Sequence, residues 1–353
     1  MDFIILNGKS SKLIGGLMIQ QLPPITKPLM RTEEETIDGR DGDIVTKLGY
    51  SAYDKTITVG LYGDYDVDEV IRYFDSEGTV IFSNELDKYY NYQIFDQIDF
   101  EKLIRFKTAT VTMHVQPFKF SSVEMPLVIE NMLNIPDYKL TQDGITVDVS
   151  DGEITVSGTV SGATGFYIPI NSVYAKIGKY KISCVASGDG INSCAGRIIQ
   201  NAPVDAQSLG GTFIRMEENV SVDATMTDDQ YYSYLWLSFD ELGSVDFTLN
   251  ITLIPYQFVV NNIGNTFSRP KLTLYGSGTI IVAVNAVNIL VVDMSTDQIT
   301  IDGESMEAYK EDVLLNRDVI GNYDSLRLKS GFNMLSWSGN VTKAVLENYS
   351  RWI

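Results

Sequence analysis

Acidic side chains are the residues of this sequence that could do chemistry, and they gather most densely in TEEETIDGRDGD, residues 32–43. Carboxylates act as general acids and bases, bind calcium, or face water. Gly39 and Gly42 favour a tight turn, because glycine adopts positive φ without a steric penalty. In a strand before this turn, Glu33 and Glu34 would lie on opposite faces. A solvated or interface-facing cluster is the favoured interpretation, ahead of an acidic lining of a DNA channel and of calcium binding or catalysis.

Other groups suited to catalysis are few. His114 is the single histidine and so the single candidate base for a Ser-His-Asp or Cys-His arrangement. The motifs HExxH, paired CxxC, GxSxG and GxxxxGKS/T do not occur in the sequence. The pairs Asp148–Asp151 and Asp228–Asp229 could hold calcium but are favoured as turn residues. We therefore predict no enzyme activity, no cofactor and no metal site.

Charge and hydropathy exclude further classes. The 353 residues carry a net charge of −19, which opposes binding of nucleic acid through its phosphates, although a channel that DNA passes through would tolerate it. No apolar run approaches the roughly 18 residues of a membrane span, and no signal peptide is recognisable, so synthesis in a cytoplasm is expected. Cys184 and Cys194 flank the turn SGDGIN and would face each other if it closes a hairpin; reduced thiols are favoured in that compartment.

The elements that must position these residues are mostly strands. Turn signals recur every 8–12 residues, which favours β-sandwiches over βαβ units. The predicted strands are 57–63, 79–83, 108–116, 144–149, 153–160, 179–187, 247–254, 270–276, 279–285, 287–294 and 298–302.

One helix is predicted over DVDEVIRYFDSEG, residues 66–78. Asp66 is placed to cap its N-terminus, Glu69 stands in the capping-box position, and Gly78 is placed to end it. Its apolar face has the spacing i, i+3, i+4, i+7 and consists of Val67, Val70, Ile71 and Phe74. This face is expected to cover a sheet.

Composition changes near residues 121–130 and 255–265, and the acidic middle segment reads as a separate domain. The two flanks resemble the distal tail proteins of long, flexible-tailed phages (siphoviruses). At the start, the resemblance lies in FIILNGKSS, MRTEEETIDGRDGDI, GYSAYDKTITV, the helix, GTVIFSNELDKYYNYQIFD and TATVTMHVQPFKF. At the end, it lies in NNIGNTFSRPKLTLYGSGTIIVAVN, QITIDGESMEAY and GFNMLSWSGNVTKAVLEN.

The resemblance implies a mainly β protein of three domains. Residues 1–122 would form a ring-building β-sandwich with one helix and a projecting hairpin, and 257–353 a galectin-like β-sandwich. Residues 123–256 would be an inserted jelly-roll sandwich, as in "evolved" family members that carry a carbohydrate-binding module. We expect the insert to fold alone and to be removable by joining Ser122 to Gln257.

Function follows from the same resemblance. Six copies would form a ring at the tail tip that joins the tail tube protein to the tail hub and the receptor-binding apparatus. DNA would pass through the ring without specific binding. The protein would be made in the bacterial host cytoplasm and end in the virion, with no membrane contact. Like charges of the acidic hairpin would recur around the ring, so Arg31, Arg40 or Lys47 of neighbours would have to offset them.

Within the insert, the stretch DDQYYSYLWLSFDE (228–241) is the candidate ligand-binding segment. Alternation places Leu235 and Leu237 on one face and three aromatic side chains on the other. Sugar rings stack on such aromatic platforms. The candidate saccharide-binding residues are Tyr232, Tyr234 and Trp236, with Arg197, Gln200, Asn201 and Arg215 as polar partners. A jelly roll also buries aromatics, and a core position is favoured for Trp236 and for Tyr167.

Three functions therefore stand side by side. The first is a structural tail-tip ring whose insert binds host cell-wall saccharide. The second is a purely structural protein whose insert contacts other baseplate proteins. The third, a glycan hydrolase, needs two carboxylates about 5–10 Å apart, and nothing singles out one acid from 46.

Overall fold

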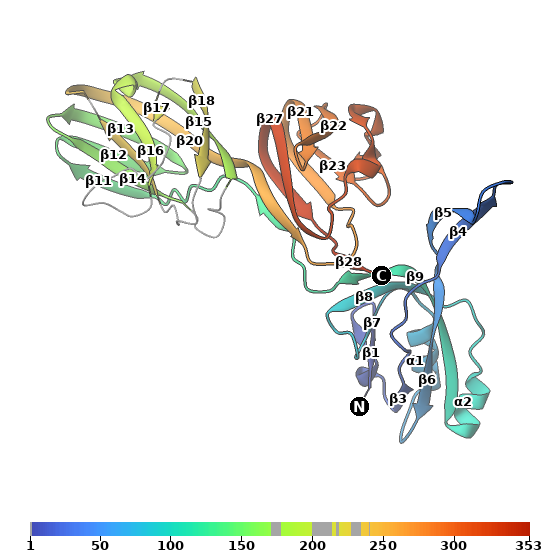
Figure 1. Ribbon diagram of the computed structural model, residues 1–353. Coiled ribbons are helices and arrows are strands. Elements are labelled where there is room, and N and C mark those ends of the chain that lie inside the picture. The colour runs from blue at the N-terminus through green and yellow to red at the C-terminus, as the bar shows by residue number, and fades with distance from the viewer. Residues whose placement is uncertain (1, 171–177, 200–213, 217–218, 227–233, 240) are drawn as a thin grey trace.

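The computed structural model describes the whole chain except residues 1, 171–177, 200–213, 217–218, 227–233 and 240 (Figure 1). The fold is mainly β, as predicted. Each predicted strand segment overlaps an observed strand, and the segments 270–276 and 279–285 fall in the same strand, β21. Buried apolar side chains form three separate clusters. We call the units built around them the N-terminal sandwich, the insert sandwich and the C-terminal sandwich.

The N-terminal sandwich is built on one antiparallel sheet with the order β2-β1-β7-β8-β9-β6-β3. Its strands are β1 (Ile4–Leu6), β2 (Lys9–Ser10), β3 (Leu17–Gln21), β6 (Tyr53–Leu61), β7 (Glu77–Phe82), β8 (Lys88–Gln93) and β9 (Thr108–Ser121). Between Thr108 and Gln116, strand β9 alternates, with Val111, Met113 and Val115 buried and Thr110 facing out. One face of the sheet therefore supplies the core and the other meets solvent.

Helix α1 (Val67–Phe74) lies where the sequence predicts a helix. The Asp66 carboxylate accepts hydrogen bonds from the backbone N–H groups of Asp68 and Glu69, as expected of an N-cap. Two details of the prediction are wrong. Tyr73 is buried together with Val70 and Phe74, whereas Val67 and Ile71 are only half-buried. The side of the helix that faces the core is therefore rotated towards Tyr73 relative to the predicted apolar face. The predicted stop, Gly78, lies inside β7, and the helix already ends before Asp75.

A second helix, α2 (Phe100–Phe106), was not predicted. Asp99 caps it by accepting from the Lys102 N–H at 2.8 Å, and Leu103 is its buried residue. Lys107 ends it with φ 60°, a left-handed conformation usually taken by glycine. Seven residues with one buried side chain show too little periodicity to stand out in a sequence.

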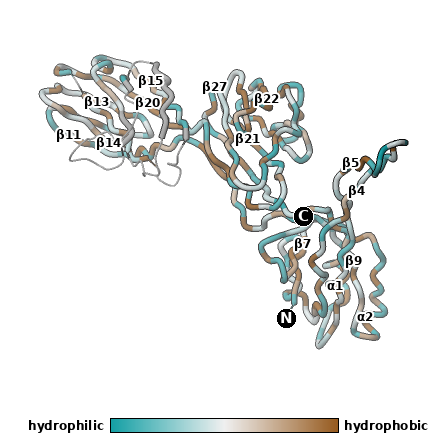
Figure 2. Tube along the Cα trace, viewed as in Figure 1, coloured by the Kyte–Doolittle hydropathy of each residue, from teal (hydrophilic) through white to brown (hydrophobic). Residues whose placement is uncertain are grey.

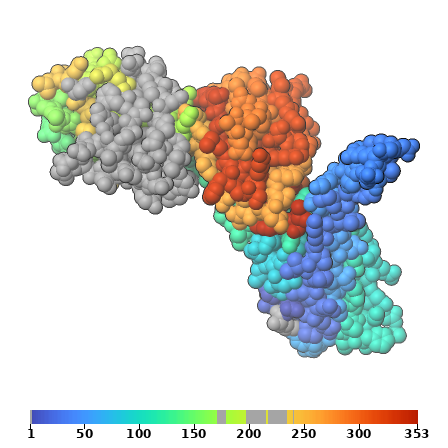
Figure 3. Space-filling model, viewed as in Figure 1, coloured from blue at the N-terminus to red at the C-terminus, as the bar shows by residue number. Residues whose placement is uncertain are grey.

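The acidic stretch forms a projecting hairpin, β4 (Met30–Thr36) and β5 (Asp43–Tyr50), which pair with each other alone (Figures 1 and 3). Gly39 and Gly42 adopt φ values of 83° and 77°, which confirms the predicted turn. The tip is hydrophilic (Figure 2), yet Val45 and Leu48 are also about half exposed.

The insert sandwich packs two sheets against each other around a shared core. One contains β11 (Tyr138–Gln142), β12 (Ile145–Ser150), β13 (Glu153–Val160), β15 (Gly178–Asp189), β18 (Asn219–Met226) and the first part of β20 (Gly243–Asn262). The other has the order β14 (Thr164–Pro169), β19 (Tyr234–Phe239), β16 (Cys194–Ile199) and β17 (Ile214–Arg215).

The two cysteines do not face each other across a hairpin. Cys184 lies on β15 and Cys194 on β16, so the SGDGIN turn carries the chain from one sheet of the sandwich to the other. Both are buried and form no disulfide. Burial raises the pKa of the Cys184 thiol to about 11, which keeps it protonated and unreactive at neutral pH.

The C-terminal sandwich continues the sheet of the insert, because the last part of β20 pairs with β27 (Gly331–Glu347). Its other strands are β10 (Leu127–Ile129), β21 (Lys271–Val284), β22 (Val287–Met294), β23 (Gln298–Asp302), β24 (Glu307–Lys310), β25 (Val313–Leu314) and β26 (Val319–Gly321). Strand β10 pairs with β27, and Ile129 belongs to this core. Residues 127–129 therefore pack with the C-terminal sandwich, ahead of the insert.

The chain end fastens the C-terminal sandwich to the N-terminal one. Strand β28 (Arg351–Trp352) pairs with β9, opposite Phe120 and Lys119. The Arg351 guanidinium is 1% exposed and lies 4.2 Å from the ring of Phe118 and 4.4 Å from that of Phe267. An Arg351 N–H also donates to Glu304 Oε2 at 3.2 Å. One buried cation thus joins both units.

A second buried charge network lies inside the N-terminal sandwich. Lys119 Nζ donates to Glu85 at 2.6 Å and Tyr90 Oη donates to the other carboxylate oxygen at 2.7 Å. Lys55 is 3% exposed and donates to the Pro24 carbonyl at 2.9 Å, just before the hairpin. Burial lowers the pKa of Lys55 to about 8, and the nearby Glu85 charge opposes that change.

Replacing Lys55 by Met should leave the stability of the N-terminal sandwich at pH 7 unchanged or raise it by about 1–4 kcal/mol, because a buried ammonium is exchanged for an apolar chain. As pH rises from about 8 towards 10.5, the folded protein has released the Lys55 proton while the unfolded chain still holds it. Unfolding then takes up a proton, so the wild-type protein should gain stability relative to Lys55→Met. Calorimetry of both proteins at pH 7 and pH 9.5 measures this; parallel pH curves would contradict it.

Candidate binding face

Residues 234–239 of the candidate aromatic segment form β19, the second strand of the four-stranded insert sheet. Its burial alternates without a break: Leu235, Leu237 and Phe239 are buried, and the residues between them are half-buried. The predicted core face is therefore confirmed. Trp236, for which a core position was favoured, lies instead on the outer face with Tyr234. The sequence preference for a buried Trp236 was wrong because the inner face of this strand is already filled by aliphatic side chains and Phe239.

Tyr167 on β14 completes an aromatic group on this outer face. It lies directly opposite Trp236 in the strand register. The two rings are nearly parallel, with centroids 6.0 Å apart and an interplanar angle of 11°, and the Tyr234 ring meets Tyr167 edge-on at 6.1 Å. Tyr167 is half-buried rather than a core residue as favoured, and this partial burial raises the pKa of its phenol. The phenol therefore stays a neutral hydrogen-bonding group.

Gly165 makes room for the Trp236 indole. A Cβ at this position would stand 2.6 Å from the Trp236 Nε1 atom and 2.5 Å from the Leu237 carbonyl oxygen. Any side chain here would push the indole away from β14. Gly165 stands 71 positions earlier in the sequence. Alternation separates the two faces of the strand, and the glycine marks the face on which there is room for the indole.

Of the polar candidates, one is placed next to Trp236 by the strand pairing and another lies on the edge of the sheet. Arg197 lies on β16 directly opposite Trp236 in the register, so the strand pairing brings these two positions together. Arg215 is exposed on the edge strand β17 and donates to the Asn192 carbonyl at 2.8 Å. Tyr232, Gln200 and Asn201 lie outside the described residues. The side chain of Arg197 is likewise not described.

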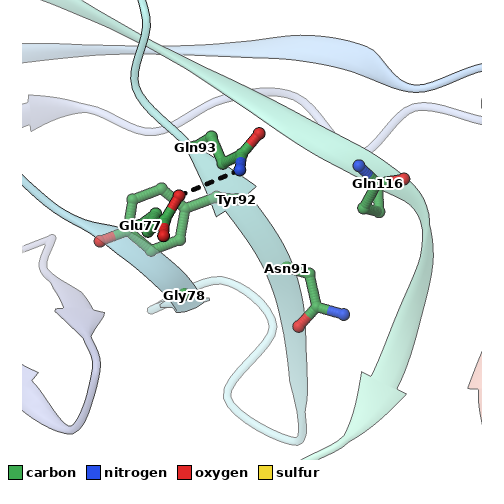
Figure 4. A pocket seen from close by; sticks show the side chains of 6 residues that line it. All are labelled: Glu77, Gly78, Asn91, Tyr92, Gln93 and Gln116. Carbon is green, nitrogen blue, oxygen red and sulfur yellow. Dashed lines mark hydrogen bonds between the residues drawn. The ribbon is translucent and has the colours of Figure 1, made fainter.

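None of the three cavities lined by described residues contains a pair of carboxylates. A cavity of about 300 Å³ on the outer face of the N-terminal sheet contains Glu77 as its one carboxylate, and Gln93 Nε2 donates to it at 3.0 Å (Figure 4). His114 pairs with Asp54 at 2.8 Å on the same face. Asp148 lies inside β12, where Lys139 of β11 donates to it at 2.7 Å across the strand pair. The prediction of a turn residue is therefore wrong for Asp148, whereas Asp151 stands in the turn that follows β12, with φ 50°.

In the described part of the chain, no group of three or more His, Cys, Asp or Glu side chains is arranged to hold a metal ion. No helix among the described residues has the length and apolar character needed to cross a membrane.

Comparison with known proteins gives limited information. No family model matches the chain, and no curated protein matches it. Among solved structures, the chain is similar to the crystal structure of SPP1 Dit (gp 19.1), described as a paradigm of the hub adsorption apparatus in phages that infect Gram-positive hosts. The TM-score is 0.42 at 10% identity, over 99% of both chains. A likeness of this size establishes neither family nor function.

The placement of Trp236 can be tested by stability. Trp236→Ala should cost about 1 kcal/mol, because the half-exposed ring loses mainly its contact with Tyr167. Leu237→Ala, one position along the same strand, should cost about 2–5 kcal/mol, because that side chain is fully buried. Thermal melting of both variants measures the difference. Equal losses, or a larger loss for Trp236→Ala, would place the indole in the core.

Proposed function

We propose that this protein is a structural component of a phage tail tip: a distal tail protein that forms a ring between tail tube and hub, and whose insert binds host cell-wall saccharide. The proposal starts from the sequence resemblance of both chain ends to that family. The observation that carries it is the contact between the first and the last part of the chain. Strand β28 pairs with β9, and Arg351 is buried between Phe118 and Phe267, while the insert sandwich lies beyond the C-terminal sandwich (Figure 1).

The domain division belongs to the same proposal. We take residues 1–122 as the ring-building domain, 123–256 as the inserted domain and 257–353 as the C-terminal domain. The three cores support this division. The pairing of β20 supports the second boundary, since Gln257 lies opposite both Lys179 of the insert and Ser336 of β27. At the first boundary, β10 and Ile129 pack with the C-terminal sandwich, so the separable part of the insert starts near residue 131.

The hairpin supports ring assembly. An isolated two-stranded hairpin is marginally stable in water, and this one exposes apolar as well as acidic side chains. In a ring, contact with a neighbouring subunit would cover Val45 and Leu48 and bring its carboxylates to basic groups such as Arg31 and Lys47. The central channel would let DNA pass without specific binding, in keeping with the charge of −19.

The insert supports an adhesive role. Tyr167, Tyr234 and Trp236 form a half-exposed aromatic group on one sheet, with Arg197 next to Trp236 in the strand register. Pyranose rings have apolar C–H faces that stack on aromatic rings and hydroxyl edges that need polar partners. This combination favours saccharide binding over the alternative of a purely structural insert. The ring of six subunits is the same in both functions.

The purified protein is expected to form six-fold rings, alone at high concentration or on addition of the tail tube protein, because weak interfaces respond to mass action. Negative-stain electron microscopy and mass photometry over a concentration series measure this. Deleting the hairpin tip, residues 33–46, should abolish the rings without unfolding the N-terminal sandwich. A protein that stays monomeric at every concentration and with tail tube protein present would contradict the ring.

Trp236→Ala should weaken binding to host cell-wall polysaccharide by about 5–150-fold, taking stacking as worth about 1–3 kcal/mol by analogy with base stacking. Phe332→Ala is the matched control, because Phe332 is an aromatic side chain 79% exposed on the C-terminal sandwich. Sedimentation of each protein with purified cell walls measures binding. Equal binding by both variants would favour the purely structural insert.

A deletion gives the second control. Removing residues 131–256 should abolish wall binding and leave ring formation intact. Ile129 lies opposite Ala344 and Gln257 opposite Ser336, so the replacement linker must span eight residues of β27. That is about 26 Å, and a Gly-Ser linker of about ten residues reaches it. Wall binding by the deleted protein would assign adhesion to the ring instead.

A further inference from the structure

A second cavity lies at the junction between the insert sandwich and the C-terminal sandwich. It is a cleft of about 150 Å³, more enclosed than the cavity on the N-terminal sheet. One wall is the outer face of the insert sheet, with Lys181 and Ser183 on β15 and Thr252 on β20. The other wall is the segment 337–342 of β27. The cleft exists only because β20 passes from one sandwich into the other at this point.

The lining has the composition of a small-ligand site. Trp337 and Tyr256 supply aromatic surface, and Trp337 is 4% exposed and held edge-on by Phe258. Hydroxyl and amide groups of Ser183, Thr252, Thr342, Asn131 and Asn340 also line the cleft. Ligand sites in proteins combine apolar walls with a few converging polar groups and occur at domain interfaces.

The charge of the lining is unlike that of the whole protein. Among the described residues that line the cleft, Lys181 is the one charged residue. Its ammonium has no ion-pair partner within 4.0 Å among the described side chains, and Asp223 of β18, whose side chain is not described, lies opposite it in the strand register. A half-buried cation in a lining of otherwise neutral groups favours an anion as ligand.

The walls are held in place independently of any ligand. Asn131 Oδ1 accepts from the backbone N–H groups of Leu253 at 2.9 Å and Leu133 at 3.2 Å, which fixes the chain where it enters the insert. Asn340 Nδ2 donates to Ser277 at 2.8 Å, which fixes β27 to β21 beside the shift in their register. A pre-formed cleft loses little conformational entropy when a ligand binds.

We propose that this cleft binds a single small anion that carries hydroxyl groups, with Lys181 facing its acidic group. The volume corresponds to roughly five water molecules, which suits one sugar acid or one polyol phosphate unit and excludes a longer chain segment. The acidic group would pair with the ammonium, the hydroxyl groups would bond the Ser183 and Thr252 side chains, and the carbon skeleton would lie against Trp337. This site is separate from the aromatic face of the other insert sheet.

Trp337 fluorescence tests the proposal in the full chain. Trp236→Phe and Trp352→Phe leave Trp337 as the only indole and remove the Trp236 platform, so a failed wall-binding proposal cannot affect the result. The probes are glucuronate and glycerol 1-phosphate, with glucose as the neutral comparison at equal ionic strength. Saturable changes with one or both anions and none with glucose are expected, and the stronger anion distinguishes a sugar acid from a polyol phosphate.

Lys181→Met should weaken anion binding at least tenfold. Lys179→Met is the matched control on the same strand, since Lys179 is exposed and does not line the cleft; it should bind normally. If Lys181→Met does not fold, Thr252→Val keeps the shape of the wall, removes one hydroxyl and should weaken binding severalfold. No saturable signal with either anion, equal binding of glucose, or unchanged binding by a folded Lys181→Met or Thr252→Val variant would overturn the proposal.

Discussion

Strand β20 must satisfy backbone hydrogen bonds on both of its edges along twenty residues, and the arrangement of the insert and C-terminal sandwiches depends on how it does so. Its first part lies between β13 and β15 of the insert, and its last part pairs with β27. The change of partner occurs at Gln257, which lies opposite residues of both units. The chain enters the insert through residues 130–137, which lie between β10 and β11, and leaves it along the continuous strand β20. One of the two connections is thus a strand shared by both sandwiches.

The opposite end of the C-terminal sandwich is fixed by charge burial rather than by a shared strand. Arg351 would be expensive to bury alone, and it is accommodated by two aromatic faces, the Phe267 carbonyl at 2.6 Å and the Glu304 carboxylate. Burial lowers the pKa of Arg351 to about 10, so the side chain remains charged at neutral pH. Because Phe118 belongs to β9 and Phe267 to the C-terminal sandwich, this cation orients one unit against the other.

The sequence predicted the β class, the strand positions and the fillings of their inner faces, because alternation is a local property. It failed where a distant residue decides the outcome. Trp236 was favoured as core, and Gly165 explains why the indole instead lies outside. The two strands predicted at 270–276 and 279–285 form one strand, β21, which continues through Gly276 with shifted register. Gly276 approaches the Asn340 carbonyl too closely for a side chain. The junction cleft combines residues from four separate segments and has no sequence signature.

The two outer faces of the insert differ in chemistry for a structural reason. The sheet that contains β19 ends at the edge strand β17, so its outer face can present Tyr167 and Trp236 as a broad, half-exposed surface suited to a polymer. The other sheet runs on into the C-terminal sandwich, whose strand β27 lines the cleft with residues 337–342 and leaves room for only one small unit beside Lys181. A ligand in that cleft would touch both sandwiches, so its binding would stiffen the junction that β20 makes. If both proposals hold, the insert separates recognition of an extended surface from a contact that sets how firmly this surface is held relative to the rest of the chain.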